Sequence, residues 1–412
     1  MRTDNSNLLN EIISIIKTEL TENLEQIDHP SLLSGIGGPI LFFSYLYKTT
    51  NDECLLNQIN QGVDILLAGV EKYKIDYSFE KGMSGIAWLL QFLVNENIID
   101  LESPDIFESF DKTIIDSIEV DIQNKRYDYF SGLIGKGVYY LERSKYNNQP
   151  HPYLTSIIQE LVNLSEHDYR GTYWQDFYSV GRSIEDKNLC SLGLSHGIPS
   201  ILVFLSEVLK LDLAEYEHDS ISKMLENAVK WVLSYHQEKD SLIFFPSRIV
   251  NKEMIYPLDP PERLAWCHGD LGIAASLLKV NESLKETYVY DAALELAKFQ
   301  ISRKEDANTG IVDACLCHGT SGVSLLFKQI FNQTDIGDFK NCSQYWLQRT
   351  VGLANLSSRS SGYKTWFEGN DGKGVWKTDF GLLNGISGIG LVLIDNLPQR
   401  SQLFNWEKVL LI

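Results

Sequence analysis

A short glycine phrase, G-x-x-G followed by an apolar stretch, recurs along this chain of 412 residues. Six copies are complete, and in the fourth of the seven a serine, Ser200, replaces the second glycine. The first glycines of the copies are Gly35, Gly82, Gly132, Gly197, Gly269, Gly319 and Gly385. A repeated unit buries its apolar face only by stacking on its neighbours, so the recurrence predicts a repeat-built architecture.

Two kinds of helix are predicted around each phrase. Stretches that are apolar on nearly every face follow the glycines and should be buried; they span residues 39–47, 86–94, 137–142, 201–209, 273–280, 323–331 and 389–397. Amphipathic stretches with a charged face precede the glycines; they span residues 8–20, 55–73, 107–122, 153–166, 221–236, 288–303 and 342–353.

Seven amphipathic helices that alternate with seven apolar ones predict an all-α protein, an α/α toroid of seven helix pairs. The inner ring would be buried, the outer ring solvated, and the last repeat would lie beside the first. We expect residues 1–412 to form a single toroidal domain. At most of the turns glycine is expected only to admit positive φ and close backbone approach, because it has no Cβ.

Composition narrows the classes of partner and compartment. The chain has 55 acidic and 36 basic residues, a formal net charge of −19, and no basic run, which argues against a nucleic-acid partner. Its six cysteines are sparse and irregularly spaced, which indicates free thiols rather than a disulfide scaffold. Neither a signal peptide nor an apolar run of about 20 residues is found. A cytoplasmic protein with no membrane span is expected.

Two copies of the phrase carry Cys-His directly before the first glycine, as Cys267-His268 and Cys317-His318. They open equivalent inner helices 50 residues apart, so their side chains should converge at one end of the ring. Thiolate together with imidazole is a ligand set that selects zinc. The four residues could form a closed structural site, or three of them could leave one position open for catalysis. Simple packing of buried cysteines and hydrogen-bonded histidines is a third interpretation. Cys315 has no counterpart before Cys267, so it is expected only to pack.

The motifs resemble those of the lanthionine synthetase C family, the lanthipeptide or lantibiotic cyclases. The resemblance covers essentially the whole chain, including the order and spacing of all seven phrases. It is carried by the run from Arg263 to Gly269, by Cys317-His318-Gly319, by the run from Gly193 to Gly197, and by Tyr127-Asp128 ahead of Gly132.

What the resemblance implies is one catalytic zinc per chain, held by Cys267, Cys317 and His318, with the fourth position left for the thiol of a substrate cysteine. Family enzymes close thioether rings on ribosomal peptides by adding that cysteine to dehydroalanine or dehydrobutyrine, an intramolecular Michael addition. The implied substrate is a dehydrated precursor peptide, and a lanthipeptide dehydratase and an exporter are candidate partners.

Four further residues match family positions. The resemblance implies that His196 exchanges the proton, that Asp128 orients or charge-stabilises this imidazole, and that Arg263 interacts with developing negative charge or with the aspartate. His268 is a departure, because many bacterial cyclases have tyrosine after the first zinc cysteine, whereas eukaryotic LanC-like relatives have histidine. It could transfer a proton, hydrogen-bond the bound thiolate, or complete a four-ligand site.

Other functions are open on sequence grounds. One is a LanC-like zinc protein that binds glutathione or another thiol without cyclising a peptide. Some glycoside hydrolases and protein prenyltransferases also have an α/α toroid fold. A hydrolase needs a pair of carboxylates across the cavity, but Asp270 is the only carboxylate within a glycine phrase. The Cys-His-Gly pairing does not match the prenyltransferase ligand pattern.

Overall fold

The structure is a computed structural model. It describes residues 2–100, 105–147, 151–175, 189–239, 242–246, 248–250, 253–254, 263–356, 360–368, 373–398 and 405–412.

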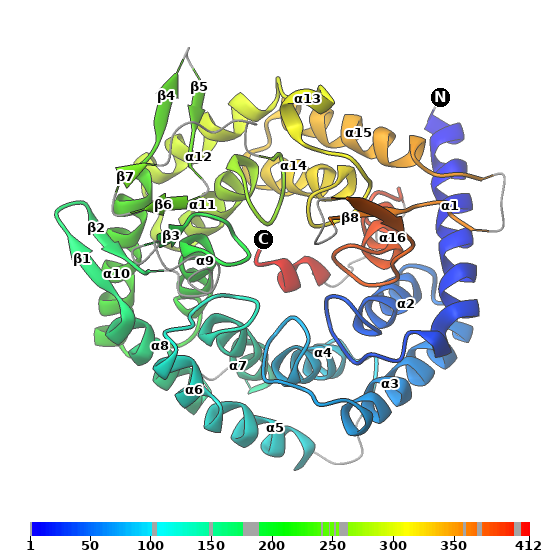
Figure 1. The fold of residues 1–412 in the computed structure, drawn as a ribbon, viewed down its shortest axis with the longest axis horizontal. Helices are drawn as coiled ribbons and strands as arrows, with labels where there is room; N and C mark the ends of the chain where they lie inside the picture. Colours follow the sequence, from blue (N-terminus) through cyan, green and yellow to red (C-terminus); the bar gives the residue numbers. More distant parts are fainter. Residues whose placement is uncertain are drawn as a thin grey trace.

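The described chain forms two concentric rings of helices (Figure 1). The inner ring consists of α2 (Gly37–Thr50), α4 (Met83–Asn95), α7 (Leu133–Asn147), α9 (Ile198–Val208), α11 (Asp270–Leu284), α14 (Thr320–Thr334) and α16 (Ile386–Asp395). The outer ring consists of α1 (Arg2–Asn23), α3 (Cys54–Lys72), α5 (Asp105–Asp116) with α6 (Ile118–Gln123), α8 (Pro152–Leu164), α10 (Glu215–Leu233), α12 (Thr287–Gln300) and α15 (Gly337–Gly352). The predicted α/α toroid is confirmed.

The difference in sequence between the two rings follows from burial. Helix α3 buries Leu55, Ile59, Val63 and Leu66, which recur every three or four residues and form one stripe. The inner helix α9 has ten buried positions among its 11 residues, because it contacts neighbours on every side. Apolar runs therefore mark the inner ring, and amphipathic runs mark the outer ring.

The ring closes, as predicted, by packing α16 against α1 and α2 (Figure 1). Backbone hydrogen bonds also join six neighbouring pairs of glycine loops around one mouth of the toroid. Written as donor to acceptor, these are Leu33 N to Glu80 O (3.2 Å), Phe79 N to Phe130 O (2.8 Å), Ser195 N to Cys267 O (3.3 Å), Trp266 N to Cys317 O (3.1 Å), Cys317 N to Leu383 O (2.9 Å) and Leu382 N to Leu33 O (2.9 Å). The last bond joins the seventh loop to the first.

The helices begin or end several residues away from their predicted bounds, and for two of them the structure shows the reason. The third outer helix is interrupted at Ser117, whose hydroxyl donates to the carbonyl of Ile114 at 2.6 Å and so competes with the helical pattern. The third inner helix is longer than residues 137–142, because the polar residues in its second half are satisfied by side chains. Arg143, for example, forms an ion pair with Asp111 at 2.7 Å.

Short elements decorate the rings. They are the hairpins β1 (Glu166–Asp168) with β2 (Gly171–Tyr173), β4 (Gln237–Lys239) with β5 (Leu242–Phe244), and β8 (Thr365–Glu368) with β9 (Gly374–Lys377), the sheet of β3 (Leu189–Ser191), β6 (Arg248–Val250) and β7 (Glu253–Met254), the helix α13 (Asp306–Thr309), and the 3-10 turns η1 (Leu24–Gln26) and η3 (Trp406–Leu410). Within the described residues, none of the helices has both the length and the apolar character needed to cross a bilayer.

The C-terminal turn η3 lies in the centre of the ring, where Figure 1 shows it in red. Trp406, Val409 and Leu410 are fully or almost fully buried. The indole of Trp266 donates to the carbonyl of Leu410 at 2.8 Å, and the hydroxyl of Tyr129 donates to the carbonyl of Val409. The turn therefore fills the middle of the toroid and is tied to the glycine loops.

Candidate metal centre

The glycine loops fold back so tightly that they leave no space for a side chain at their first glycine. At Gly269, with φ +127°, a Cβ would lie 2.0 Å from the carbonyl oxygen of Arg263. At Gly319 it would lie 2.3 Å from the amide nitrogen of Cys315. Glycine is therefore required at these two positions, because neighbouring backbone atoms lie too close to leave room for a Cβ. The Cys-His pair before each of these glycines stands where an inner helix begins, at the same mouth of the ring.

A second feature of the loops lies six residues before the glycine. In five loops a side chain there accepts a hydrogen bond from the backbone two residues later: His29 from Ser31 (3.2 Å), Asp76 from Ser78 (2.9 Å), Ser191 from Gly193 (3.3 Å), Asp313 from Cys315 (3.0 Å) and Asp379 from Gly381 (2.8 Å). In the other two loops this position is Arg126 or Arg263, and a guanidinium has no acceptor. Their side chains are thus not used to form the turn.

The structure brings Cys267, Cys317 and His318 together. Their two sulfur atoms and one imidazole nitrogen all lie within 4.8 Å of one another, and all three residues are half-buried. The backbone bond from Trp266 to Cys317 fixes the two loops side by side. Two thiols and one imidazole in this arrangement fit a tetrahedral zinc ion with one position left over. His268 does not belong to this cluster.

The two thiols have opposite proton affinities. Hydrogen bonds from the Cys317 thiol and from His318 hold the pKa of Cys267 well below its usual value, against the effect of burial. The hydrogen bond to Cys267, together with burial, raises the pKa of Cys317 well above its usual value. A divalent cation between the two sulfur atoms would favour the thiolate form of both cysteines.

His196 and Asp128 join the third and fourth loops. The Nδ1 atom of His196 lies 2.9 Å from Oδ1 of Asp128, which is 2% exposed. The carboxylate also accepts bonds from the amides of Phe130 (3.0 Å) and Ser131 (3.1 Å), which fix its position. The Phe130 ring packs edge-on against the imidazole at 4.8 Å between centroids. The imidazole is thus held with Nδ1 toward a buried carboxylate.

His268 and Arg263 lie beside these groups. The His268 ring is packed so closely on the fourth loop that a Cβ at Gly193 would lie 2.1 Å from its Nδ1 atom. The rings of His268 and His196 are 6.5 Å apart between centroids. The aliphatic stem of Arg263 packs on Gly310, where a Cβ would lie 2.9 Å from Cγ, and its positive charge acts to lower the pKa of Cys317.

Asp313 is a residue that the sequence analysis missed. Its Oδ1 atom accepts from the amide of Cys315, and its Oδ2 atom accepts from the amide of Trp366 at 3.0 Å. It therefore anchors both the loop that carries Cys317 and the β8–β9 hairpin. Asp313, Cys315 and His318 form a second group of closely spaced ligand atoms. Burial, followed by the charge of Asp313, raises the pKa of Cys315 well above its usual value, which favours a packed thiol. The signal in the sequence was the aspartate six residues before the glycine, shared with Asp76 and Asp379.

Comparisons with known proteins agree with this architecture. The profile of the family described as lanthionine synthetase C-like protein matches residues 26–411. The nisin biosynthesis protein NisC of Lactococcus lactis subsp. lactis is 23% identical over 413 residues, which cover 95% of this chain and 91% of NisC. The solved structure of nisin cyclase superposes with a TM-score of 0.73 at 19% identity, over 97% of this chain and 96% of that one.

The fold and the loop cluster define an α/α toroid with a thiol and imidazole site at one mouth. Since the profile matches nearly the whole chain, the protein belongs to the lanthionine synthetase C-like family. The family resemblance drawn from the motifs is confirmed. The likeness to nisin cyclase shows the shared toroidal fold.

Proposed function

We propose that this protein is a zinc-dependent lanthipeptide cyclase, which joins cysteine thiols of a dehydrated precursor peptide to dehydroalanine or dehydrobutyrine. The observation that carries the proposal is the convergence of Cys267, Cys317 and His318 within 4.8 Å, next to the His196–Asp128 pair. In this proposal residues 1–412 act as one toroidal domain with one zinc, in the cytoplasm. A dehydratase must supply the dehydro residues, so a dehydratase and an exporter are its candidate partners.

Cys267, Cys317 and His318 are the proposed zinc ligands. Bound zinc would lower the pKa of a substrate thiol in the remaining position and so supply a nucleophilic thiolate near neutral pH. The backbone bond from Trp266 to Cys317 holds the two cysteine loops at a fixed separation. The site would therefore be formed before the peptide arrives.

The reaction conserves every atom of the peptide. The cysteine sulfur bonds to the β-carbon, the π electrons of the C=C bond move to the carbonyl oxygen, and the α-carbon of the resulting enolate takes a proton. The proton lost by the thiol balances the proton gained by the α-carbon. A cyclised product thus has the mass of its dehydrated precursor.

His196 is the proposed proton carrier. With Nδ1 engaged by Asp128, proton exchange falls to Nε2, and the buried carboxylate stabilises the imidazolium form. We assign Arg263 to the developing enolate charge, because its guanidinium is not used to form the turn and its charge acts on Cys317. We assign His268 to hydrogen bonding or proton transfer beside the thiolate, because its ring faces that of His196.

A second candidate function is supported by His268, the residue type that eukaryotic LanC-like relatives have at this position. In that case the zinc would hold glutathione or another small thiol, and no ring would close. The two functions differ in the identity of the attacking thiol, so the mass of a reacted peptide separates them.

The test combines metal analysis with thiol counting. Zinc is measured by elemental analysis in the wild-type protein and in Cys317→Ala, with Cys342→Ala, a buried free cysteine in α15, as the matched control. A dehydrated precursor peptide is then incubated with each protein, with and without glutathione, before alkylation and mass spectrometry.

For a cyclase we expect about one zinc per chain, lost only in Cys317→Ala, and loss of alkylatable peptide thiols at unchanged peptide mass. A peptide heavier by one glutathione, with its own cysteines still free, would favour the thiol-binding alternative. Absence of zinc from the wild-type protein would contradict both.

A further inference from the structure

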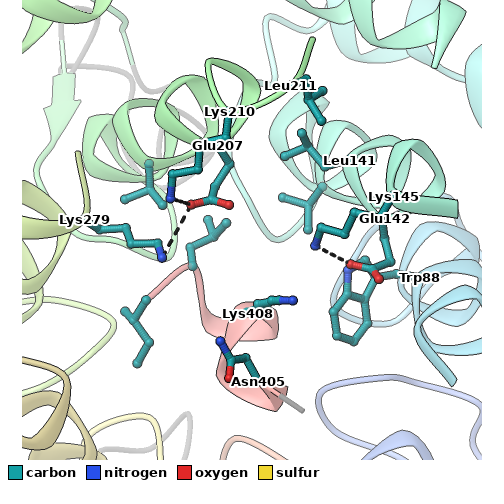
Figure 2. Close-up of a pocket in the computed structure, with 14 residues that line it drawn as sticks. Trp88, Leu141, Glu142, Lys145, Glu207, Lys210, Leu211, Lys279, Asn405 and Lys408 are labelled. Atoms are coloured by element: carbon teal, nitrogen blue, oxygen red, sulfur yellow. Dashed lines mark hydrogen bonds and ion pairs between the residues drawn. The ribbon is translucent and has the colours of Figure 1, made fainter. Parts of the chain in front are cut away.

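A cavity lies at the end of the toroid opposite the glycine loops. It has a volume of about 290 Å³ and is lined by residues toward the C-terminal ends of inner helices, such as Lys145 of α7 and Lys279 of α11, and by the central turn η3. Figure 2 shows Lys408 of η3 between these helices. The glycine loops precede the N-termini of the same helices, and none of Cys267, Cys317 and His318 is among the residues that line this cavity.

Lysines outnumber glutamates among the residues that line this cavity. Four lysines and two glutamates are among its 14 lining residues, whereas the chain as a whole has a formal net charge of −19. Three of the lysines have carboxylate partners: Lys145 pairs with Glu142 at 2.7 Å, Lys210 with Glu207 and Glu282 at 2.6 Å each, and Lys279 with Glu282 at 3.3 Å and Glu207 at 3.5 Å. These three ammonium groups therefore share three carboxylates.

Lys408 is the fourth lysine, and it differs from the others. Among the described residues, no carboxylate lies within 4.0 Å of its Nζ atom, and Figure 2 draws no ion pair to it. Burial, followed by the nearby Lys145 ammonium, lowers its pKa, while the charges of Glu142, Glu96 and Glu207 act in the opposite direction at longer range. The cavity thus holds one positive charge without a contacting counter-charge. A half-buried ammonium of this kind is stabilised by an anion.

The apolar walls of the cavity and its carboxylates restrict the kind of anion that can bind beside Lys408. Trp88, Val138, Leu141 and Val203 give the cavity an apolar side, and Asn405 adds a neutral amide. A dianion such as phosphate would be repelled by the carboxylates of Glu142 and Glu207 and would leave the apolar walls without contacts. A single carboxylate on an apolar body matches one ammonium and these walls. The volume lies near the lower limit of ligand pockets, about 300 Å³, so the ligand is small.

We propose that this cavity binds a small organic monoanion, with its carboxylate on Lys408 and its apolar body against Trp88 and the α7 and α9 walls. The site is separate from the proposed zinc centre. Its occupancy does not depend on whether the protein closes thioether rings.

The proposal is tested with 4-phenylbutyrate as the probe, titrated calorimetrically into the zinc-loaded full chain. Its neutral isostere 4-phenylbutanamide and inorganic phosphate are titrated in parallel. We expect 1:1 binding of 4-phenylbutyrate, with the amide about tenfold weaker, because it lacks the charge that pairs with the ammonium. Equal binding of acid and amide, tighter binding of phosphate, or no binding of the acid at millimolar concentration would overturn the proposal.

Three variants locate the binding. Lys408→Met should remove the preference for the acid over the amide, whereas Lys112→Met, an exposed lysine on outer helix α5, should leave it unchanged. Cys317→Ala removes a proposed zinc ligand, so binding that persists in this variant does not occur at the metal. Wild-type affinity in Lys408→Met, or loss of binding in Cys317→Ala alone, would refute the assignment to this cavity.

Discussion

At the scale of single residues, Asp128 combines two roles, since it fixes the turn of its own loop and contacts the proposed proton carrier. It lies four residues before its glycine, whereas Asp76, Asp313 and Asp379 lie six before theirs. From there its carboxylate accepts the amides of Phe130 and Ser131 and still reaches His196 at 2.9 Å. One side chain thus forms the turn and orients the proposed proton carrier.

Asp128→Asn should therefore slow ring closure by about 10²–10⁴, since the neutral amide cannot stabilise the imidazolium, while zinc content stays at the wild-type value. Cyclisation of a dehydrated precursor is followed by mass-resolved thiol alkylation, together with elemental analysis. Asp76→Asn is the matched control, because Asp76 makes the same kind of turn with the amide of Ser78. Equal rates in the two variants would show that Asp128 acts only on the turn.

The absence of a side chain at Gly193 leaves room for the His268 ring. An added Cβ would lie 2.1 Å from Nδ1 of His268 and 2.7 Å from the carbonyl oxygen of Cys267. Gly193→Ala should lower the free energy of unfolding by about 1–3 kcal/mol, because either group must move, and should weaken zinc retention. Gly352→Ala, where a Cβ meets no atom within 4 Å, is the control for both chelator-competition and urea-unfolding measurements. Unchanged zinc retention in Gly193→Ala would mean that the loop adapts without disturbing Cys267.

At the scale of elements, a buried ion pair joins three inner helices. Lys328 of α14 contacts Asp395 of α16, which also accepts a hydrogen bond from Tyr45 of α2 at 3.0 Å. Asp395 is 1% exposed, so removing the lysine takes the positive charge away from a buried carboxylate. Lys328→Met should cost about 3–5 kcal/mol of unfolding free energy, and the double variant with Asp395→Leu should recover part of it.

Urea unfolding measures this difference. Lys230→Met, which breaks an exposed pair with Glu226 on α10, should change the unfolding free energy by less than about 1 kcal/mol. If Lys328→Met were no more costly than Lys230→Met, the ion pair would have no role in closing the ring.

Some of these elements and their contacts were predictable from the sequence, and others were not. Helix α9 was predictable, because a run of helical length that is apolar on every face must be buried on every face, as it is in the inner ring. The full length of α7 was not, because Arg143 looks solvent-exposed in the sequence until Asp111 is placed beside it. The meeting of the two Cys-His pairs at one mouth was predictable from their repeat-equivalent positions, whereas the choice of Cys267, Cys317 and His318 without His268 came from the family resemblance. The proximity of Gly193 and His268 was not, because it depends on how two loops 75 residues apart meet.

At the scale of the whole molecule, the toroid has a filled centre. A ring of helix pairs leaves an axial space that its own repeats do not occupy, and η3 enters it from the end of the described chain. The sequence of η3 has two charged residues, Glu407 and Lys408, between apolar ones. It is too short to show a periodicity from which its buried position could be predicted. The interior position follows only from contacts with distant loops, such as that between Trp266 and Leu410.

Trp406→Ala tests whether this turn is part of the core. The indole is fully buried and packs edge-on against Tyr45 at 6.4 Å between centroids. Its removal should lower the free energy of unfolding by about 3–5 kcal/mol, the cost of a cavity the size of a tryptophan. The far-UV circular dichroism should remain that of the wild type, because the belt of loop hydrogen bonds and the packing of α16 on α1 and α2 still close the ring. The matched control is Leu353→Ala, an exposed leucine after α15 whose loss should cost less than about 0.5 kcal/mol. If urea unfolding gave the same small decrease in unfolding free energy for both variants, the two rings would be stable without the packing of η3. A large decrease confined to Trp406→Ala would show that η3 is part of the stabilising core.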